Sequence, residues 1–254
     1  MARADPPLYL QAPRRAFDAA RLGLPIRPSS WTAWDALWAV GGSILLANLT
    51  AVLLAVLGLE FEQGWILLAL AAPWVAMIGW PLLASKRRGN GAAVDLGLQA
   101  RWSDALWGLL GGIAAFVSGL VAGIMSIQLF GDFTSAAGDE AQRLAEESSP
   151  WVLLVFALMV VIGAPIAEEL AFRGLLWSGL AKRGFPVWVP ILVSTVAFAL
   201  IHFEPKRMLV LLSIGLVLGV IRWRTRSLSA CIVAHAVNNL PGAIGILALS
   251  ATPT

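Results

Sequence analysis

The chain has 254 residues, of which 59% are hydrophobic and only 13% are charged. A soluble domain of this length could not bury so much apolar surface in its core. The formal net charge is +3, but the Lys and Arg residues lie in short stretches between apolar runs and not along one helix face, which argues against a nucleic-acid partner. The composition therefore predicts an integral membrane protein.

The apolar runs are long enough to cross about 30 Å of hydrocarbon as helices of roughly 20 residues. We predict an all-α membrane bundle of about seven transmembrane helices (six to eight), over residues 34–59, 64–85, 104–130, 151–178, 186–203, 208–223 and 228–249. The fifth and sixth runs are short. The polar residues 204–207 between them fit either a tight turn or part of a re-entrant segment.

Residues 1–30 contain several arginines and prolines and lack the apolar stretch of a secretory signal, which predicts a cytoplasmic tail. With the amino terminus in the cytoplasm, the basic stretches after the second, fourth and sixth spans also face the cytoplasm, as the positive-inside rule requires. The acidic loop 131–149 then lies on the opposite side. We expect 31–130 to hold the amino-terminal transmembrane helices and 150–249 to form a carboxy-terminal helical core.

The fourth span carries ionisable side chains, which are costly inside a bilayer and therefore indicate a partner or a function. Glu169 and Arg173 are four residues apart, so they share a helix face and can form an ion pair. Glu168 points about 100° away from that pair. A carboxylate left without a cation in apolar surroundings is a candidate general base, so we predict Glu168 as the catalytic residue and Glu169 and Arg173 as its structural support. The alternative is a charge network of all three side chains that only locks helices together.

The only two histidines also lie within apolar runs, His202 in the fifth span and His235 in the seventh. His235 and Asn239 are four residues apart and share a helix face. Glu168, His202 and His235 are expected at comparable depths on three separate helices. A shared polar cavity inside the membrane would explain this placement better than three unrelated packing residues.

Such a cavity supports hydrolysis in two ways. In one, Glu168 and His202 polarise a water molecule while His235 and Asn239 donate hydrogen bonds to the developing oxyanion, with no cofactor. In the other, Glu168, His202 and His235 bind zinc and leave a fourth position for water. The side chains alone permit either mechanism. The substrate partner would be a peptide or membrane protein, next to the lipid bilayer itself.

The three segments in order, Glu168-Glu169-x-x-x-Arg173, Phe198-x-x-x-His202 and His235-x-x-x-Asn239, resemble the CAAX-protease and bacteriocin-processing family, also called the Abi or type-II CAAX prenyl endopeptidase family. The resemblance covers about 150–245. It implies an intramembrane endopeptidase whose first motif glutamate activates water, with the first histidine assisting and the last histidine and asparagine forming the oxyanion hole. It also makes 150–249 a catalytic core, and the plasma (inner) membrane of a bacterium the expected location. We favour the metal-free, glutamic-type mechanism.

Two other functions use the same polar residues. A non-catalytic immunity or scaffold protein would bind a peptide or partner helix in the cavity, and it would tolerate loss of the Glu168 carboxylate. A proton-coupled transporter would use Glu168 and the histidines as a relay, and it would move protons without cleaving any product. The sequence disfavours the transporter because it lacks the paired broken helices often found at such sites.

Overall fold

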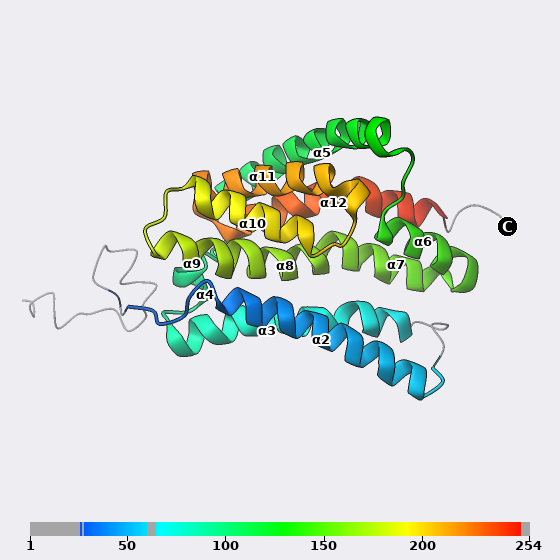
Figure 1. The fold of residues 1–254 in the computed structure, drawn as a ribbon, viewed down its shortest axis with the longest axis horizontal. Coiled ribbons are helices and arrows are strands. Elements are labelled where there is room, and N and C mark those ends of the chain that lie inside the picture. Colours follow the sequence, from blue (N-terminus) through cyan, green and yellow to red (C-terminus); the bar gives the residue numbers. More distant parts are fainter. Residues whose placement is uncertain (1–25, 27, 60–64, 250–254) are drawn as a thin grey trace, which may run out of the picture.

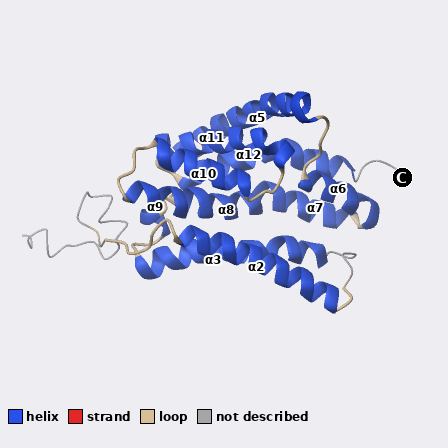
Figure 2. Ribbon diagram, viewed as in Figure 1, coloured by secondary structure: helices blue, strands red, loops and turns tan. Residues whose placement is uncertain are grey.

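The computed structural model describes residue 26, residues 28–59 and residues 65–249. Most of the predicted tail 1–30 therefore lies outside the described residues. The described part consists of helices, turns and loops, with no strand (Figure 2). The all-α prediction is confirmed.

Among the described residues, six helices are long and apolar enough to cross a membrane. They are α2 (Asp35–Val56), α3 (Trp65–Arg88), α5 (Trp102–Phe130), a continuous rod over Pro150–Lys182, α11 (Met208–Thr225) and α12 (Leu228–Leu249). The fifth predicted span is the shorter apolar helix α10 (Trp188–Leu200), whose 13 residues extend for only about 20 Å. The expected bundle of about seven apolar helices is confirmed, although α10 by itself is shorter than the hydrocarbon layer.

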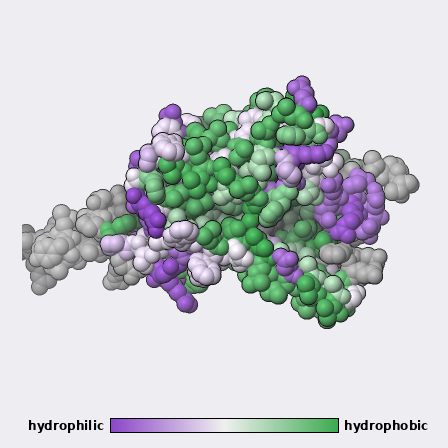
Figure 3. All heavy atoms as spheres, in the orientation of Figure 1, coloured by the Kyte–Doolittle hydropathy of each residue, from purple (hydrophilic) through white to green (hydrophobic). Residues whose placement is uncertain are grey.

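The helices form three layers, which Figure 1 shows from the side. The first contains α5, α10, α11 and α12, with α5 packed along both α11 and α12. The rod over Pro150–Lys182 is the second layer, and the α2–α3 hairpin is the third. Apolar side chains cover much of the outer surface over the first layer, and hydrophilic residues gather toward the two ends of the bundle (Figure 3). An apolar exterior of this kind suits lipid better than water.

Glycines let α10 and α11 approach closely beside the rod. A Cβ atom on Gly215 would lie 3.1 Å from Thr195 Cγ2 and 3.3 Å from Phe198 Cδ1. One turn later, a Cβ on Gly219 would lie 3.1 Å from Ile191 Cγ2. This contact fixes the position of Phe198, which lies next to both histidines.

The acidic loop predicted over 131–149 contains a helix instead, α6 (Ala136–Glu147). Ser135 caps it by accepting a hydrogen bond from the Gly138 N–H. Arg143 pairs with Glu140 and Glu147 at helical spacing along its exposed side, while Leu144 is buried. The charged residues made this segment read as a loop, but their spacing is that of a surface helix.

Residues 204–207 form a tight turn that contains the short 3-10 helix η5 (Pro205–Arg207). The Glu204 carboxylate accepts a hydrogen bond from the Ala136 N–H at the start of α6, and Lys206 donates to the Asp132 carbonyl. This turn therefore joins α10 and α11 at the same end of the bundle as the acidic helix. The rod, α3 and α11 each carry basic residues in their last turn, and these last turns lie at the other end of the bundle (Figure 1).

Candidate active site

The rod that carries the carboxylates is a long helix with two π-helical segments. It runs through α7 (Pro150–Leu158), η3 (Met159–Gly163), α8 (Ala164–Glu169), η4 (Leu170–Leu176) and α9 (Trp177–Lys182). Pro165 has no N–H, so it cannot complete the α-helical hydrogen bond to the carbonyl four residues earlier. Just before it, the Ala164 N–H donates to the Met159 carbonyl five residues back, which is the π-helical pattern. Such wider turns often lie at functional sites.

Glu169 and Arg173 form the ion pair that their spacing predicts, with 2.7 Å between Arg173 Nη1 and Glu169 Oε1. Both side chains are fully buried. Arg173 also donates from Nη2 to the Gly215 carbonyl of α11, and its guanidinium lies over the Phe198 ring. These contacts join the rod to α10 and α11.

Glu168 differs from its neighbour in both exposure and pairing. Its side chain is 18% exposed, whereas that of Glu169 is 0% exposed. Its Oε2 atom is buried without a hydrogen-bond partner among the described residues. His235 Nε2 lies 3.8 Å from that oxygen. Glu169 Oε2 is likewise buried without a partner among the described residues. The two glutamates therefore differ in that Glu169 is fully buried and binds Arg173 and His235 through Oε1, whereas Glu168 is partly exposed and makes no side-chain hydrogen bond among the described residues.

His235 lies between the two glutamates. Its Nδ1 atom is 3.0 Å from Glu169 Oε1, and its Nε2 atom faces Glu168. A carboxylate accepts, so Nδ1 carries a proton and donates it to Glu169. Glu169 thus has a second role beyond the predicted pairing with Arg173, because it also orients the imidazole.

His202 reaches the same region from α10. Its Nδ1 lies 2.7 Å from the Phe198 carbonyl, which can only accept, so Nδ1 donates and Nε2 of the neutral ring is free to accept. Its ring packs against Phe198, with ring centres 4.8 Å apart, and His235 packs against the same ring at 5.6 Å. The two histidines therefore lie beside one aromatic side chain, and the structure gives no direct contact between His202 and Glu168.

Asn239 is one turn beyond His235 on α12. Its amide donates to the Val160 carbonyl at 2.9 Å, and its oxygen accepts from Asn238. Val160 belongs to η3, so this bond ties α12 to the π-helical segment just before the glutamates. One amide hydrogen of Asn239 is used here, which leaves the other for a ligand.

Sequence reasoning missed three groups that hold this site together. Phe198 contacts Arg173 and both histidines, and the carbonyls of Gly215 and Val160 accept from Arg173 and Asn239. Phe198 stands in the second motif, so its position four residues before His202 was the available signal. No side-chain pattern could reveal the two carbonyls.

The alternative zinc set of Glu168, His202 and His235 is not gathered for metal binding. Within the described residues, no group of three or more His, Cys, Asp or Glu side chains is arranged to hold a metal ion. The residues as they lie therefore do not fit a zinc site. The choice between the two mechanisms stays a prediction.

The comparisons with known proteins bear on this site directly. Residues 150–241 match the family model described as Type II CAAX prenyl endopeptidase Rce1-like. The match supports an assignment of this segment to the CAAX-protease and bacteriocin-processing family. It contains every residue of the site described above, from Glu168 to Asn239.

A curated relative of this chain is also named as a membrane peptidase. The chain is 26% identical over 151 residues to a Bacillus subtilis (strain 168) protein named "Putative membrane peptidase YdiL". The match covers 59% of this chain and 57% of the relative, so the chain spans little more than half of that protein's length. No solved structure matches the chain. At family level, the two matches support a CAAX-protease-like membrane peptidase.

Proposed function

We propose that the protein is an intramembrane endopeptidase that hydrolyses peptide bonds in membrane-associated proteins or their carboxy-terminal tails, with Glu168 activating the attacking water. The observation that carries the proposal is the contrast between two adjacent glutamates. Glu169 is fully buried and binds Arg173 and His235 through Oε1, whereas Glu168 is partly exposed and makes no side-chain hydrogen bond among the described residues. A general base needs such a free acceptor next to a space that water and substrate can reach.

In the proposed reaction, Glu168 removes a proton from water as the water oxygen attacks the peptide carbonyl carbon. A tetrahedral intermediate forms, with negative charge on the former carbonyl oxygen. The C–N bond then breaks, and Glu168 returns the proton to the departing amine. The free Nε2 of His202 is suited to accept a hydrogen bond from the same water.

His235 and Asn239 are the proposed oxyanion donors. With Nδ1 donating to Glu169, His235 can donate from Nε2 only when both of its ring nitrogens carry a proton. Asn239 contributes its second amide hydrogen. Loss of one such donor typically lowers turnover by a factor of about 10² to 10³.

The test compares the carboxy-terminal peptides of membrane proteins from cells that carry the wild type, Glu168→Gln or the control Glu146→Gln, in which an exposed carboxylate of α6 is changed. Because a general base contributes about 10²- to 10⁴-fold, we expect termini that depend on the wild type and on the control to vanish in Glu168→Gln. Cleavage of the strongest substrate is then repeated with purified proteins in liposomes. Unchanged termini in Glu168→Gln, with the folded protein present at wild-type level, would refute the proposal and favour a binding or immunity protein.

Metal content is measured separately on the purified protein. One tightly bound zinc per chain, lost in His202→Ala, would overturn the metal-free mechanism and leave the peptidase proposal intact. Glu168 and the histidines would then be ligands in a conformation other than the one described here.

A further inference from the structure

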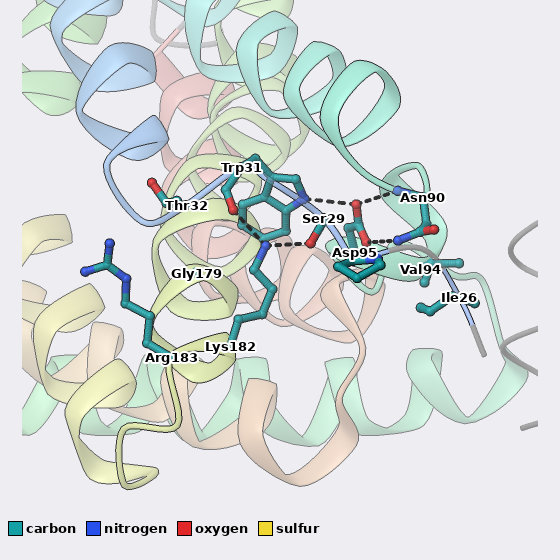
Figure 4. Close-up of a pocket in the computed structure, with 11 residues that line it drawn as sticks. Ile26, Ser29, Trp31, Thr32, Asn90, Val94, Asp95, Gly179, Lys182 and Arg183 are labelled. Atoms are coloured by element: carbon teal, nitrogen blue, oxygen red, sulfur yellow. Dashed lines mark hydrogen bonds between the residues drawn. The ribbon is translucent and has the colours of Figure 1, made fainter. Parts of the chain in front are cut away.

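A cavity lies at the basic end of the bundle, away from the residues of the proposed active site. Its volume is about 570 Å³. Three segments surround it: the residues before α2, the stretch from Asn90 into the short helix α4 (Ala92–Asp95), and the end of α9 (Figure 4). Its polar lining consists of two cations, one carboxylate, two hydroxyls and one amide: Lys182, Arg183, Asp95, Ser29, Thr32 and Asn90.

The ammonium group of Lys182 is held in a fixed position by neutral groups. It donates to Ser29 Oγ at 2.7 Å and to the Trp31 carbonyl at 2.8 Å, and it lies 3.2 Å from the centre of the Trp31 ring (Figure 4). An ammonium has three N–H donors, so one remains. Within the described residues, no carboxylate lies within ion-pair distance of Lys182 or Arg183. Both positive charges are therefore available to an anion.

The one carboxylate in the cavity is already occupied. Asp95 accepts from Trp31 Nε1 at 2.9 Å, and from the backbone N–H and side-chain amide of Asn90 at 2.7 and 3.2 Å (Figure 4). It packs so tightly that a Cβ on Gly89 would lie 1.7 Å from its Oδ2. Asp95 thus builds the wall of the cavity, and Arg183 projects on the side away from it.

The level of the cavity along the membrane-spanning helices indicates which anion it can bind. Lys182 is the last residue of the span Pro150–Lys182, Trp31 precedes the span that begins at Asp35, and Asn90 follows the span that ends at Arg88. The cavity is therefore at the level where helices leave the hydrocarbon. Lipid phosphates lie at that level, and basic pockets between transmembrane helices there bind anionic headgroups.

We propose that this cavity is a binding site for a phosphate group, held by Lys182 and Arg183 with the hydroxyls of Ser29 and Thr32, and that the phosphate belongs to an anionic phospholipid. Arg183 supplies a planar set of donors suited to phosphate oxygens, and Lys182 supplies a point charge already fixed by Trp31. A bound headgroup would join the segment before α2 to the end of the rod that carries Glu168.

The test titrates the detergent-purified full chain with phosphatidylglycerol or phosphatidylcholine and counts bound lipids by native mass spectrometry. We expect one phosphatidylglycerol per chain at low concentration and weaker binding of the zwitterionic lipid. A cation close to an anionic headgroup strengthens binding about fivefold, so Lys182→Gln with Arg183→Gln should weaken it by about 25-fold. Arg183→Gln alone, which removes no hydrogen bond of the described fold, should weaken it about fivefold.

The matched control is Lys86→Gln with Arg87→Gln, which removes two cations at the same end of the bundle that do not line the cavity. It should keep the phosphatidylglycerol affinity of the wild type. Equal loss in the control pair, unchanged affinity in both cavity variants, or equal binding of the two lipids would each overturn the site.

A second arm distinguishes the source of the phosphate. Inorganic phosphate and glycerol 3-phosphate, each at millimolar concentration, are added to the phosphatidylglycerol complex. No displacement supports the lipid as the ligand. Displacement that depends on Lys182 and Arg183 supports the phosphate site but refutes the lipid as its source, in favour of a soluble phosphate compound.

Discussion

The buried pair of Glu169 and Arg173 predicts an unusual pattern of stability effects. Glu169→Leu would leave the Arg173 charge in the interior, where its remaining partners among the described residues are the Gly215 carbonyl and the Phe198 ring. Arg173→Met would leave Glu169 with only His235. The double variant removes both charges at once and replaces them by apolar side chains of similar size.

The magnitudes follow from the complete burial of both side chains. Removing one partner of a buried pair costs about 3 to 5 kcal/mol, whereas replacing both is often close to neutral. For a chain of this size, a loss of about 3 to 5 kcal/mol in a single variant lowers the unfolding temperature by roughly 6 to 20 °C. Arg173→Met should fall near the lower end, because Glu169 keeps the hydrogen bond from His235. The double variant should recover most of the loss.

The chain offers a direct assay, because its only cysteine, Cys231, is buried. A thiol-reactive fluorophore therefore reports unfolding of the detergent-solubilised protein as temperature rises. We expect both single variants to react at lower temperature than the wild type and the double variant to react within a few degrees of it. A double variant at least as unstable as the two single losses combined would refute the reasoning, since the charges would then contribute independently.

Two further predictions use the same assay. Gly112→Ala should lower the free energy of unfolding by about 1 to 3 kcal/mol, because its Cβ would lie 2.4 Å from Val237 Cβ and 2.6 Å from the Ala234 carbonyl oxygen. The control Gly123→Ala, whose Cβ would have its nearest neighbour at 3.8 Å, should be neutral or stabilising. Equal effects of the two substitutions would contradict the packing of α5 on α12. Arg226→Gly should stabilise by about 0.5 to 1 kcal/mol, because Arg226 ends α11 with φ of 54°, where glycine is favoured, whereas Arg224→Gly inside the helix should destabilise. A loss of stability in Arg226→Gly would refute the claim of backbone strain.

The sequence predicted the parts of the fold that depend on composition and local spacing. Long apolar runs indicated the spanning helices, and the four-residue interval indicated the pairing of Glu169 with Arg173, which is confirmed. The helix α6 was missed because its charges resemble those of a loop, although Arg143 pairs with Glu140 and Glu147 at helical spacing. Local pattern therefore predicts pairs within one helix well and misses short surface helices.

Contacts between helices could not be predicted in the same way. Hydropathy places a span in the membrane, but it does not fix how far one helix is rotated or shifted against the next. The hydrogen bond from His235 to Glu169, and that from Asn239 to the Val160 carbonyl, depend on such rotations. The assignment of Glu168, His202, His235 and Asn239 to catalysis stays a prediction, because it depends on how these side chains lie relative to a bound substrate.

The two adjacent glutamates show how one helix can separate stability from chemistry. They are the same residue type one position apart, yet the 100° rotation between them puts Glu169 against Arg173 and His235 and leaves Glu168 partly exposed, without a side-chain hydrogen bond among the described residues. Removing the charge of Glu169 should therefore lower the unfolding temperature, whereas Glu168→Gln should leave it near the wild-type value and abolish cleavage. If Glu168→Gln destabilised the protein as much as Glu169→Leu, both carboxylates would belong to one structural charge network, and the case for Glu168 as the base would fail.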